Sequence, residues 1–488
     1  MFTSLAPAPR RRAGATVVVT VLAVATLSCA LMQTVIIPLI PQLPTLLDVT
    51  PDQASWLVTA TLITGAISLP TISRLADMFG KRRMILLCLA ALFVGSMLSV
   101  FATSLTVQIV ARSLQGFSFA LVPATFSILR DELPRERLTM AVALISATLG
   151  LGGAIGLPVA GIVFNLWGWH AVFWLAGGLA LLTAVAVILV IPESPVRAGG
   201  RFDLLGALLL SGALLALLVA ITNGNNWGWL SLTTVGLLAV SLLLFVAWFP
   251  WELRTTDPLV DLRTSSARPV LLVNIAALLA GIAMFGNMIS TTQLLQEPEA
   301  TGYGFGLTVL QAGVAFLPIG LIFVVFAPLA GALSRICGPE LTLILGCSVM
   351  FVGYVSRIWL MGSPAQVVVG ACIVAIGMTT TLSTLAVIIM KSVPLDETAA
   401  ANGLNTLART AGFAVASAAV TAVLASATTT VGGVDLPTQA AYVGLFVLGA
   451  CASLGAGLAA FAIPRGDSRA AATADLVSTA TDLPGVVA

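Results

Sequence analysis

About fourteen long apolar blocks run through the sequence, and they restrict its fold more than any other feature. A helix needs about 20 mostly apolar residues to cross a bilayer. Unpaired backbone groups are costly in hydrocarbon, and no ten-residue alternation typical of a barrel occurs, so we expect each block to be a helix. The approximate cores of the predicted spans are residues 14–40, 54–72, 84–103, 106–129, 138–165, 171–191, 204–222, 231–250, 269–293, 306–332, 341–361, 366–390, 402–426 and 438–463.

The composition agrees with a membrane protein and excludes several other classes. Of the 488 residues, 59% are hydrophobic and 9% are charged, whereas a soluble domain usually carries about 25% charged residues. A net charge of +2 gives no basis for nucleic-acid binding. The sequence has no Walker motif, and its cysteines lack the spacing of metal ligands. We therefore expect an all-α polytopic membrane protein that is not an enzyme and holds no metal.

Basic residues fall on one side of the predicted spans. If the N-terminus is inside, then Arg10, Lys81, Arg130 and Arg465 all lie in inner segments. The predicted outer loops contain acids but no Lys or Arg, as the positive-inside rule requires. The pattern predicts that both termini are cytoplasmic. The small, polar tail at 466–488 is expected to be disordered.

Three basic residues lie within predicted spans. Arg357 is near an outer end and can snorkel, and Arg409, about two turns from an inner end, can do so in part. Arg112 lies roughly 9 Å from the outer end of the fourth span. Because an ionisable residue inside a membrane is by default a functional-site hypothesis, Arg112 is the main candidate.

The inner loop "SRLADMFGKRRM" contains a candidate conformational latch. Asp77 begins a tight turn that Gly80 permits, and Arg82 and Arg83 follow. A carboxylate at the end of a span can pair with an Arg or a helix N-terminus in only one conformation. The alternative is a charged loop that simply obeys the positive-inside rule.

A weaker copy of this loop follows the tenth span, in "GALSRICGPE". Gly331 and Gly338 keep the seven-residue spacing of Ser73 and Gly80, and Arg335 replaces the acid. If spans 9–14 repeat spans 1–6, the tenth span is the counterpart of the second, and each is followed by one copy of the loop. Parallel repeats in a polytopic protein indicate a two-bundle transporter with a central site.

The fifth predicted span contains a run of small residues in "ATLGLGGAIGLPVAGIVF". Gly152 and Gly156 form a G-x-x-x-G face, and Pro158 and Gly161 follow. Small residues let helices approach closely, and Pro with Gly allows a bend. Ordinary helix packing is the alternative interpretation.

Three segments of the sequence resemble motifs of the major facilitator superfamily, in particular of its fourteen-span drug:proton antiporter branch. They are the inner loop, "RSLQGF" at 112–117 and "GLPVAG" at 156–161. The resemblance covers residues 14 to 463. It implies two six-helix bundles, at 1–192 and 266–465, joined by two extra spans at 193–265. It also implies a multidrug exporter of the bacterial cytoplasmic (inner) membrane that works by alternating access, with a proton gradient as energy source and no cofactor.

One position departs from the family pattern. Met32 stands where the first span of the branch usually carries an acid, and no acid falls in the middle of any predicted span. Arg112 therefore has three possible partners. It can be structural, hydrogen-bonded to amides, hydroxyls or backbone carbonyls. It can bind an anionic part of the substrate, or pair with an acid of an outer loop. The candidate partners in the protein are Gln33, Thr34, Gln115, Asp48, Asp52, Glu297 and Glu299.

The expected substrates are amphipathic small molecules, with neutral, zwitterionic or anionic compounds favoured over hydrophobic cations. We expect a monomer whose only other partners are protons and the lipid bilayer. The alternatives are a lipid or metabolite exporter, a facilitator without proton coupling, and a transport-deficient sensor. The predicted substrate and proton pathway consists of Arg112, Gln115, Gln33, Thr34, Asn287, Thr292 and Gln293, with Met284 and Phe285 among the apolar contacts.

Overall fold

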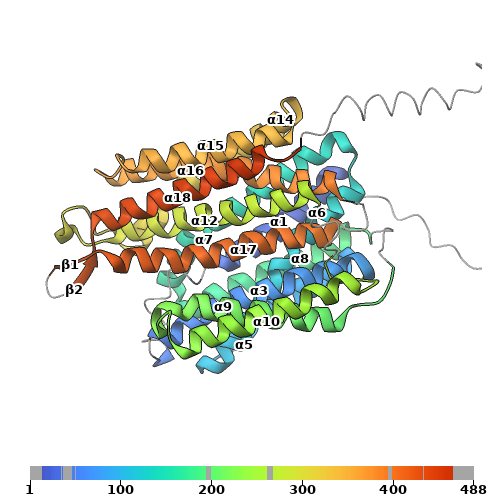
Figure 1. Cartoon of the computed structure of the whole chain (residues 1–488), viewed down its shortest axis with the longest axis horizontal. Helices are drawn as coiled ribbons and strands as arrows, with labels where there is room; N and C mark the ends of the chain where they lie inside the picture. The colour runs from blue at the N-terminus through green and yellow to red at the C-terminus, as the bar shows by residue number, and fades with distance from the viewer. Residues whose placement is uncertain are drawn as a thin grey trace, which may run out of the picture.

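The computed structural model describes residues 14–34, 36, 47–49, 51–193, 199–260, 267–393, 398–431 and 434–464. Within these residues, 13 helices are long and apolar enough to cross a membrane, or up to 14 if a bent pair is one span. The long helices run roughly side by side along the longest axis of the molecule (Figure 1). The expected helical membrane fold is confirmed. The predicted positions of both termini and the predicted disordered tail lie outside the described residues.

The first bundle contains the helices up to residue 190. Its fourth span is not a continuous α-helix, because a 3-10 segment, η2, separates α5 from α6 directly after Gly116. Pairs α1 and α7, and α4 and α8, pack along their lengths. The elements are α1 (Ala15–Thr34), α3 (Pro51–Phe79), α4 (Lys81–Phe101), α5 (Leu105–Gly116), η2 (Phe117–Ala120), α6 (Leu121–Glu132), α7 (Arg135–Trp167) and α8 (Trp169–Val190).

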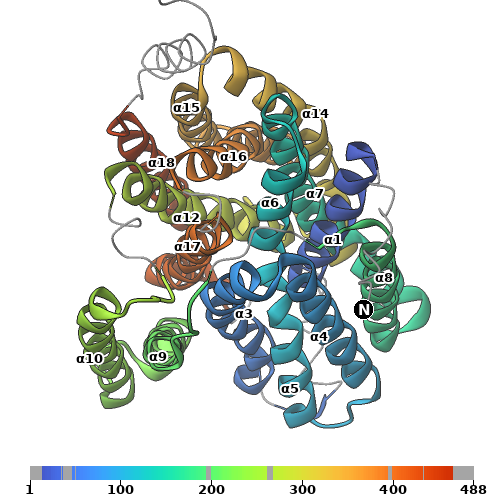
Figure 2. The ribbon, with the colours of Figure 1, turned by 90° about the vertical axis from the view of Figure 1, so that its right-hand side faces the viewer.

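Two further helices lie at the edge of the molecule. Helices α9 (Leu204–Trp227) and α10 (Leu232–Arg254) pack mainly against each other. Figure 2 shows this pair beside the two bundles. Helix α9 contacts both α3 and α17, and therefore both bundles. The peripheral position leaves the space between the bundles free of α9 and α10.

The second bundle follows, and it carries the one departure from an all-α fold in the described residues. A two-stranded antiparallel hairpin joins α17 to α18, with Thr428 opposite Pro437. Tyr303 donates a hydrogen bond to the carbonyl oxygen of Pro437 and so holds this hairpin to a neighbouring loop. The elements are α12 (Arg268–Gln296), η3 (Glu299–Thr301), α13 (Val309–Ala315), α14 (Leu317–Ile336), α15 (Pro339–Arg357), α16 (Pro364–Ser392), α17 (Thr398–Ser426), β1 (Thr428–Val431), β2 (Val434–Pro437) and α18 (Gln439–Phe461).

Two features of the bundles agree with the internal repeat that the sequence predicts. Gly80 precedes α4 with φ 116°, and Gly338 precedes α15 with φ 84°. A positive φ favours glycine, which explains why both copies of the inner loop keep it. The helices that meet across the interface also correspond, because α3 packs on α17 and α14 packs on α7.

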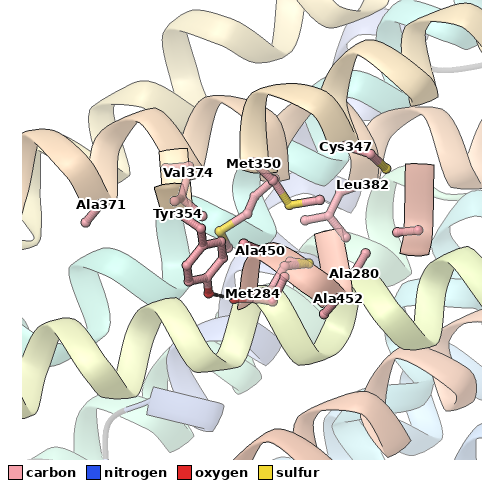
Figure 3. Close-up of a cluster of buried hydrophobic side chains, with 14 of the residues drawn as sticks. Ala280, Met284, Cys347, Met350, Tyr354, Ala371, Val374, Leu382, Ala450 and Ala452 are labelled. Carbon is pink, nitrogen blue, oxygen red and sulfur yellow. Dashed lines mark hydrogen bonds between the residues drawn. The ribbon is translucent and has the colours of Figure 1, made fainter. Parts of the chain in front are cut away.

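The core of the second bundle is an apolar cluster, mainly from α12, α14, α15, α16 and α18. Figure 3 shows Tyr354 in this cluster, with Met284 and Met350 beside it. Tyr354 donates a hydrogen bond to the carbonyl oxygen of Ala283 on α12, which satisfies its buried hydroxyl. Met284 and Leu382 of this cluster also line a cavity between the bundles, so the core supports the candidate site directly.

Candidate transport pathway

A cavity of ≈ 360 Å³ lies between the two bundles. The first bundle contributes α1, α3 and α7, and the second contributes α12, α14, α16 and α17. Most of its lining side chains are apolar, as is usual for ligand sites. The polar or charged lining residues are Thr34, Asn287, Arg409 and Ser417, and the large apolar ones include Met284, Phe285, Met288, Phe316, Phe323, Met378 and Phe413.

The structure brings only some of the predicted pathway residues to this cavity. Thr34 and Asn287 line it. Thr292 is not among the lining residues, and it donates a hydrogen bond to the carbonyl oxygen of Met288 at 2.8 Å. Gln293 is exposed. The side chain of Gln33 lies outside the described residues.

Arg112 is 1% exposed and lies away from the cavity, in the first bundle. Its Nε donates to the carbonyl oxygen of Leu57 at 3.2 Å, and its Nη1 donates to Oε1 of Gln115. Gln115 in turn donates to the hydroxyls of Ser96 and Ser99, at 3.3 and 3.5 Å. The partners seen are therefore a backbone carbonyl and an amide, which is the arrangement expected of a structural guanidinium.

The proposed acidic partners of Arg112 do not reach it in the part of the chain that the structure describes. No described carboxylate lies within 4.0 Å of its guanidinium. Glu297 instead accepts a hydrogen bond from Tyr442 at 2.7 Å. Met32, at the position of the family acid, is 5% exposed and packs in an apolar cluster of the first bundle. The side chain of Asp52 lies outside the described residues.

Arg357 does not snorkel in this structure, although its place in the sequence would allow it. Its side chain is 1% exposed, donates a hydrogen bond to Oδ1 of Asn287, and lies 4.2 Å from the ring centroid of Phe446. Gly370 makes room for it, because a Cβ there would lie 2.7 Å from Cγ of Arg357. Helices α16 and α18 both pack against α15. The guanidinium is thus directed into the bundle and not toward the bilayer surface.

Arg409 was not among the pathway residues expected from sequence, but its side chain lines the cavity. It lies on α17 one turn before Phe413 and two turns before Ser417, and all three face the cavity. The sequence did contain a signal, since Arg409 is one of three basic residues within the spans. What the sequence lacked was the direction in which the side chain points.

The predicted latch residue Asp77 joins the two bundles. It lies near the end of α3 and is 1% exposed. Its Oδ2 accepts a hydrogen bond from the backbone N–H of Ala400 at 2.9 Å, in the first turn of α17. The first N–H groups of a helix lack intrahelical partners and attract negative charge. Asp77 therefore caps a helix of the opposite bundle.

A second cross-bundle contact, from Arg130, was not expected from sequence. Arg130 belongs to α6, and its Nη2 donates to the carbonyl oxygen of Val393 at 2.8 Å. Its Nη1 donates to Oγ1 of Thr398, the first residue of α17. The same end of the interface is therefore held by a carboxylate and a guanidinium from the first bundle.

The other predicted latch residues act within the first bundle in this structure. Arg82 donates to the carbonyl oxygen of Ile188 at 2.6 Å, and Nε of Arg83 lies 3.6 Å from Oε2 of Glu193. A Cβ at Gly80 would lie 2.7 Å from Cδ of Glu193. These contacts hold the start of α4 to the end of α8.

A buried ion pair stabilises the same region. Nζ of Lys81 lies 2.6 Å from Oδ2 of Asp131, and their side chains are 0% and 1% exposed. The pair links α4 to α6. It therefore fixes the helix that carries Arg130 relative to the loop that carries Gly80.

The small residues of the fifth span allow close packing between α7 and α1. A Cβ at Gly152 would lie 2.6 Å from Cβ of Ala30, and one at Gly156 would collide with Oγ1 of Thr34. Gly161 has more room, with Leu310 at 3.5 Å. Helix α7 bends by 44° between residues Glu136–Gly153 and Pro158–Trp167. Proline removes a backbone hydrogen bond and is a common cause of such a bend.

These features define a class: a polytopic membrane protein in which two related helical bundles enclose a cavity and are joined at one end by polar contacts. The profile of the Major Facilitator Superfamily matches residues 22–204 and 202–417. The chain belongs to this superfamily, as its motifs predicted.

Curated relatives include resistance and export proteins. The chain is 32% identical over 294 residues to the tetracenomycin C resistance and export protein of Streptomyces glaucescens, a match that covers 60% of this chain and 53% of that protein. It is 27% identical over 381 residues to the multidrug resistance protein Stp of Mycobacterium tuberculosis, covering 77% of this chain and 69% of that protein. The match thus spans about half of the first relative.

The fold agrees with a solved structure. The human organic anion transporter MFSD10 superposes with a TM-score of 0.65 over 91% of this chain and 99% of its own, at 16% sequence identity. At this identity the likeness concerns the fold alone.

Proposed function

We propose that this protein exports small amphipathic molecules, such as antibiotics, other drugs or metabolites, by alternating access. One observation carries the proposal: a mainly apolar cavity lies between two bundles that are bridged at one end by hydrogen bonds. Such cavities bind amphiphiles through apolar contact and a few placed polar groups. The resistance and export proteins among its relatives support the same function.

The contacts of Asp77 and Arg130 supply the conformational device that alternating access needs. Both bind backbone groups at the ends of α16 and α17, so they exist only while those helix ends are close to the first bundle. By the positive-inside rule this end faces the cytoplasm. The structure then corresponds to a state closed toward the cytoplasm, and opening requires both contacts to break.

Proton antiport in the bacterial cytoplasmic membrane, by a monomer with cytoplasmic termini, is proposed from the family resemblance. No described residue that lines the cavity is a carboxylate, and His170 is exposed at the start of α8. A proton-coupling group would therefore act from outside the cavity wall. The same observation favours a second candidate, a lipid or metabolite facilitator without proton coupling.

Accumulation of chemically diverse compounds by inside-out membrane vesicles tests the proposal. Vesicles that contain the protein should take up amphipathic compounds faster than vesicles without it, and a protonophore should abolish uptake against a gradient. Uptake that persists with the protonophore would favour the facilitator. Uptake of no compound at all would contradict export and favour a sensor.

A further inference from the structure

The cavity between the bundles holds one cationic side chain, that of Arg409. None of the other described lining residues is charged, and the polar ones are Thr34, Asn287 and Ser417. The salt bridges among the described residues are those of Lys81 with Asp131 and of Arg83 with Glu193. No described carboxylate therefore neutralises Arg409.

A second guanidinium lies directly behind the wall. Arg357 donates to Oδ1 of Asn287, and its own Nε and Nη2 atoms have no hydrogen-bond partner among the described residues. Because a guanidinium can only donate, this contact fixes which atom of Asn287 is the oxygen. Among the described residues, the amide nitrogen has two distant acceptors, the carbonyl oxygen of Ala371 at 3.5 Å and Sδ of Met378 at 4.0 Å. The second bundle thus presents the cavity with cationic and donor groups.

An unpaired guanidinium in a low-dielectric site is costly, and a bound anion removes that cost. The planar fork of Arg matches a carboxylate, sulfonate or phosphate better than an ammonium does. A cationic ligand would be repelled by the same group. The large side chains around it, including Met288 and Phe413, offer apolar contact to the rest of a ligand.

We infer that Arg409 anchors an acidic group of the cargo, and that the transported class is amphipathic anions whose apolar body lies against the Met and Phe side chains of the cavity. This inference rests on the proposed export function. It also assigns the anion-binding role to Arg409 and not to Arg112, which lies outside the cavity and already has neutral partners.

Two fluorescent probes of the same ring system test the inference. These are 1-anilinonaphthalene-8-sulfonate and N-phenyl-1-naphthylamine, which lacks the sulfonate. Binding is measured as the rise in melting temperature of the purified full chain in detergent, followed by circular dichroism, over a range of probe concentrations. The variants are Arg409→Gln and Arg409→Lys. Arg254→Gln, an exposed arginine at the end of α10, is the matched control.

The sulfonate should stabilise the wild type and Arg254→Gln at lower concentrations than the neutral probe. Arg409→Gln should require roughly 10- to 100-fold more sulfonate for the same shift, as expected for loss of a charge-assisted hydrogen bond, with the neutral probe unaffected. Arg409→Lys should fall between them. Equal affinity of the wild type for both probes would overturn the inference, even if Arg409→Gln fails to fold.

Uptake by inside-out vesicles separates this inference from the export proposal. Accumulation of the neutral probe and of ethidium, without the sulfonate, would overturn the anion anchor and leave export intact. Binding of the sulfonate that depends on Arg409, without uptake of any compound, would support the anchor and contradict export.

Discussion

Oδ2 of Asp77 and the backbone nitrogen of Ala400 lie 2.9 Å apart, although 323 positions separate them in the sequence. The contact places a carboxylate of the first bundle at the N-terminus of a helix of the second. Helix N-termini carry a partial positive charge and unsatisfied N–H groups. This hydrogen bond can therefore form only while the two bundles are together at this end.

Replacing Asp77 with Asn should favour opening at this end. The neutral amide keeps a hydrogen-bond acceptor but loses the charge, which is worth about 1–2 kcal/mol near a helix terminus, or roughly a tenfold change in population. Ser73 is 0% exposed, and a Cβ at Gly403 would collide with its hydroxyl oxygen. In a cysteine-free background, labelling of Ser73→Cys by an impermeant maleimide from the cytoplasmic side should become roughly tenfold faster.

A matched substitution controls for the loss of a negative charge. Asp257 accepts a hydrogen bond from the backbone N–H of Arg201 at 2.9 Å and makes no described contact between the bundles. Asp257→Asn should leave the labelling rate unchanged. An unchanged rate in Asp77→Asn as well would show that the Asp77 contact does not hold this end closed.

Breaking the ion pair of Lys81 and Asp131 should lower the stability of the protein strongly, whereas replacing both residues by apolar ones should lower it little. Both side chains are buried, so Lys81→Met removes the cation that neutralises a buried carboxylate and should destabilise the protein by about 3–5 kcal/mol. The double variant Lys81→Met, Asp131→Leu should recover most of that loss. Denaturant unfolding in mixed micelles measures both. A double variant as unstable as the single one would contradict the pairing.

Gly156→Ala should destabilise the contact between α1 and α7. The added methyl group collides with Oγ1 of Thr34, and overpacking of this kind typically costs about 1–3 kcal/mol. Thr34→Ala in the same chain should restore stability, because it removes the colliding atom. Gly178 on α8 has no described atom within 4 Å of a Cβ, so Gly178→Ala is the control and should be neutral or stabilising. Failure of the double variant to recover would contradict this packing.

Arg112→Ala should act on stability and not on substrate choice. It removes the charged donor to Leu57 and Gln115, a loss of about 1.5–3 kcal/mol for each bond to a charged group. Melting temperature should fall, and uptake of every compound that the wild type transports should fall in the same proportion. Gln115→Leu should show a smaller loss of the same kind. A stable Arg112→Ala protein that loses only anionic cargo would assign substrate binding to Arg112.

Much of the fold could be predicted from sequence because the relevant signals are local. The length of each apolar block determines a span. A glycine that precedes a helix at positive φ, as Gly80 and Gly338 do, can be recognised in the sequence at both copies of the loop. The position of Asp77 near the end of α3 could also be predicted, because Asp77 and Gly80 belong to the same short loop segment. Its partner Ala400 could not be named, because a backbone N–H carries no sequence signature.

The direction of side chains within the spans could not be predicted. In a soluble helix the polar face identifies the exposed side. Most of the spans here are apolar on every face, so the sequence does not show whether Arg357 or Arg409 points to lipid, to the bundle or to the cavity. Arg357 points into its bundle, where Gly370 on α16 leaves room for it and the ring of Phe446 on α18 lies 4.2 Å away. Such room depends on residues far away in the sequence.

The central claim is that cargo binds in the cavity between the bundles, and filling that cavity tests it most directly. Leu149 lines the cavity from α7 and is partly exposed to it. The purified protein is reconstituted in proteoliposomes with an imposed proton gradient. Uptake of a transported compound should be fast for the wild type. It should fall at least ~10-fold for Leu149→Trp, at an unchanged melting temperature, because the indole occupies space that the ligand needs. Uptake by Leu149→Trp at the wild-type rate and the wild-type KM would contradict the account.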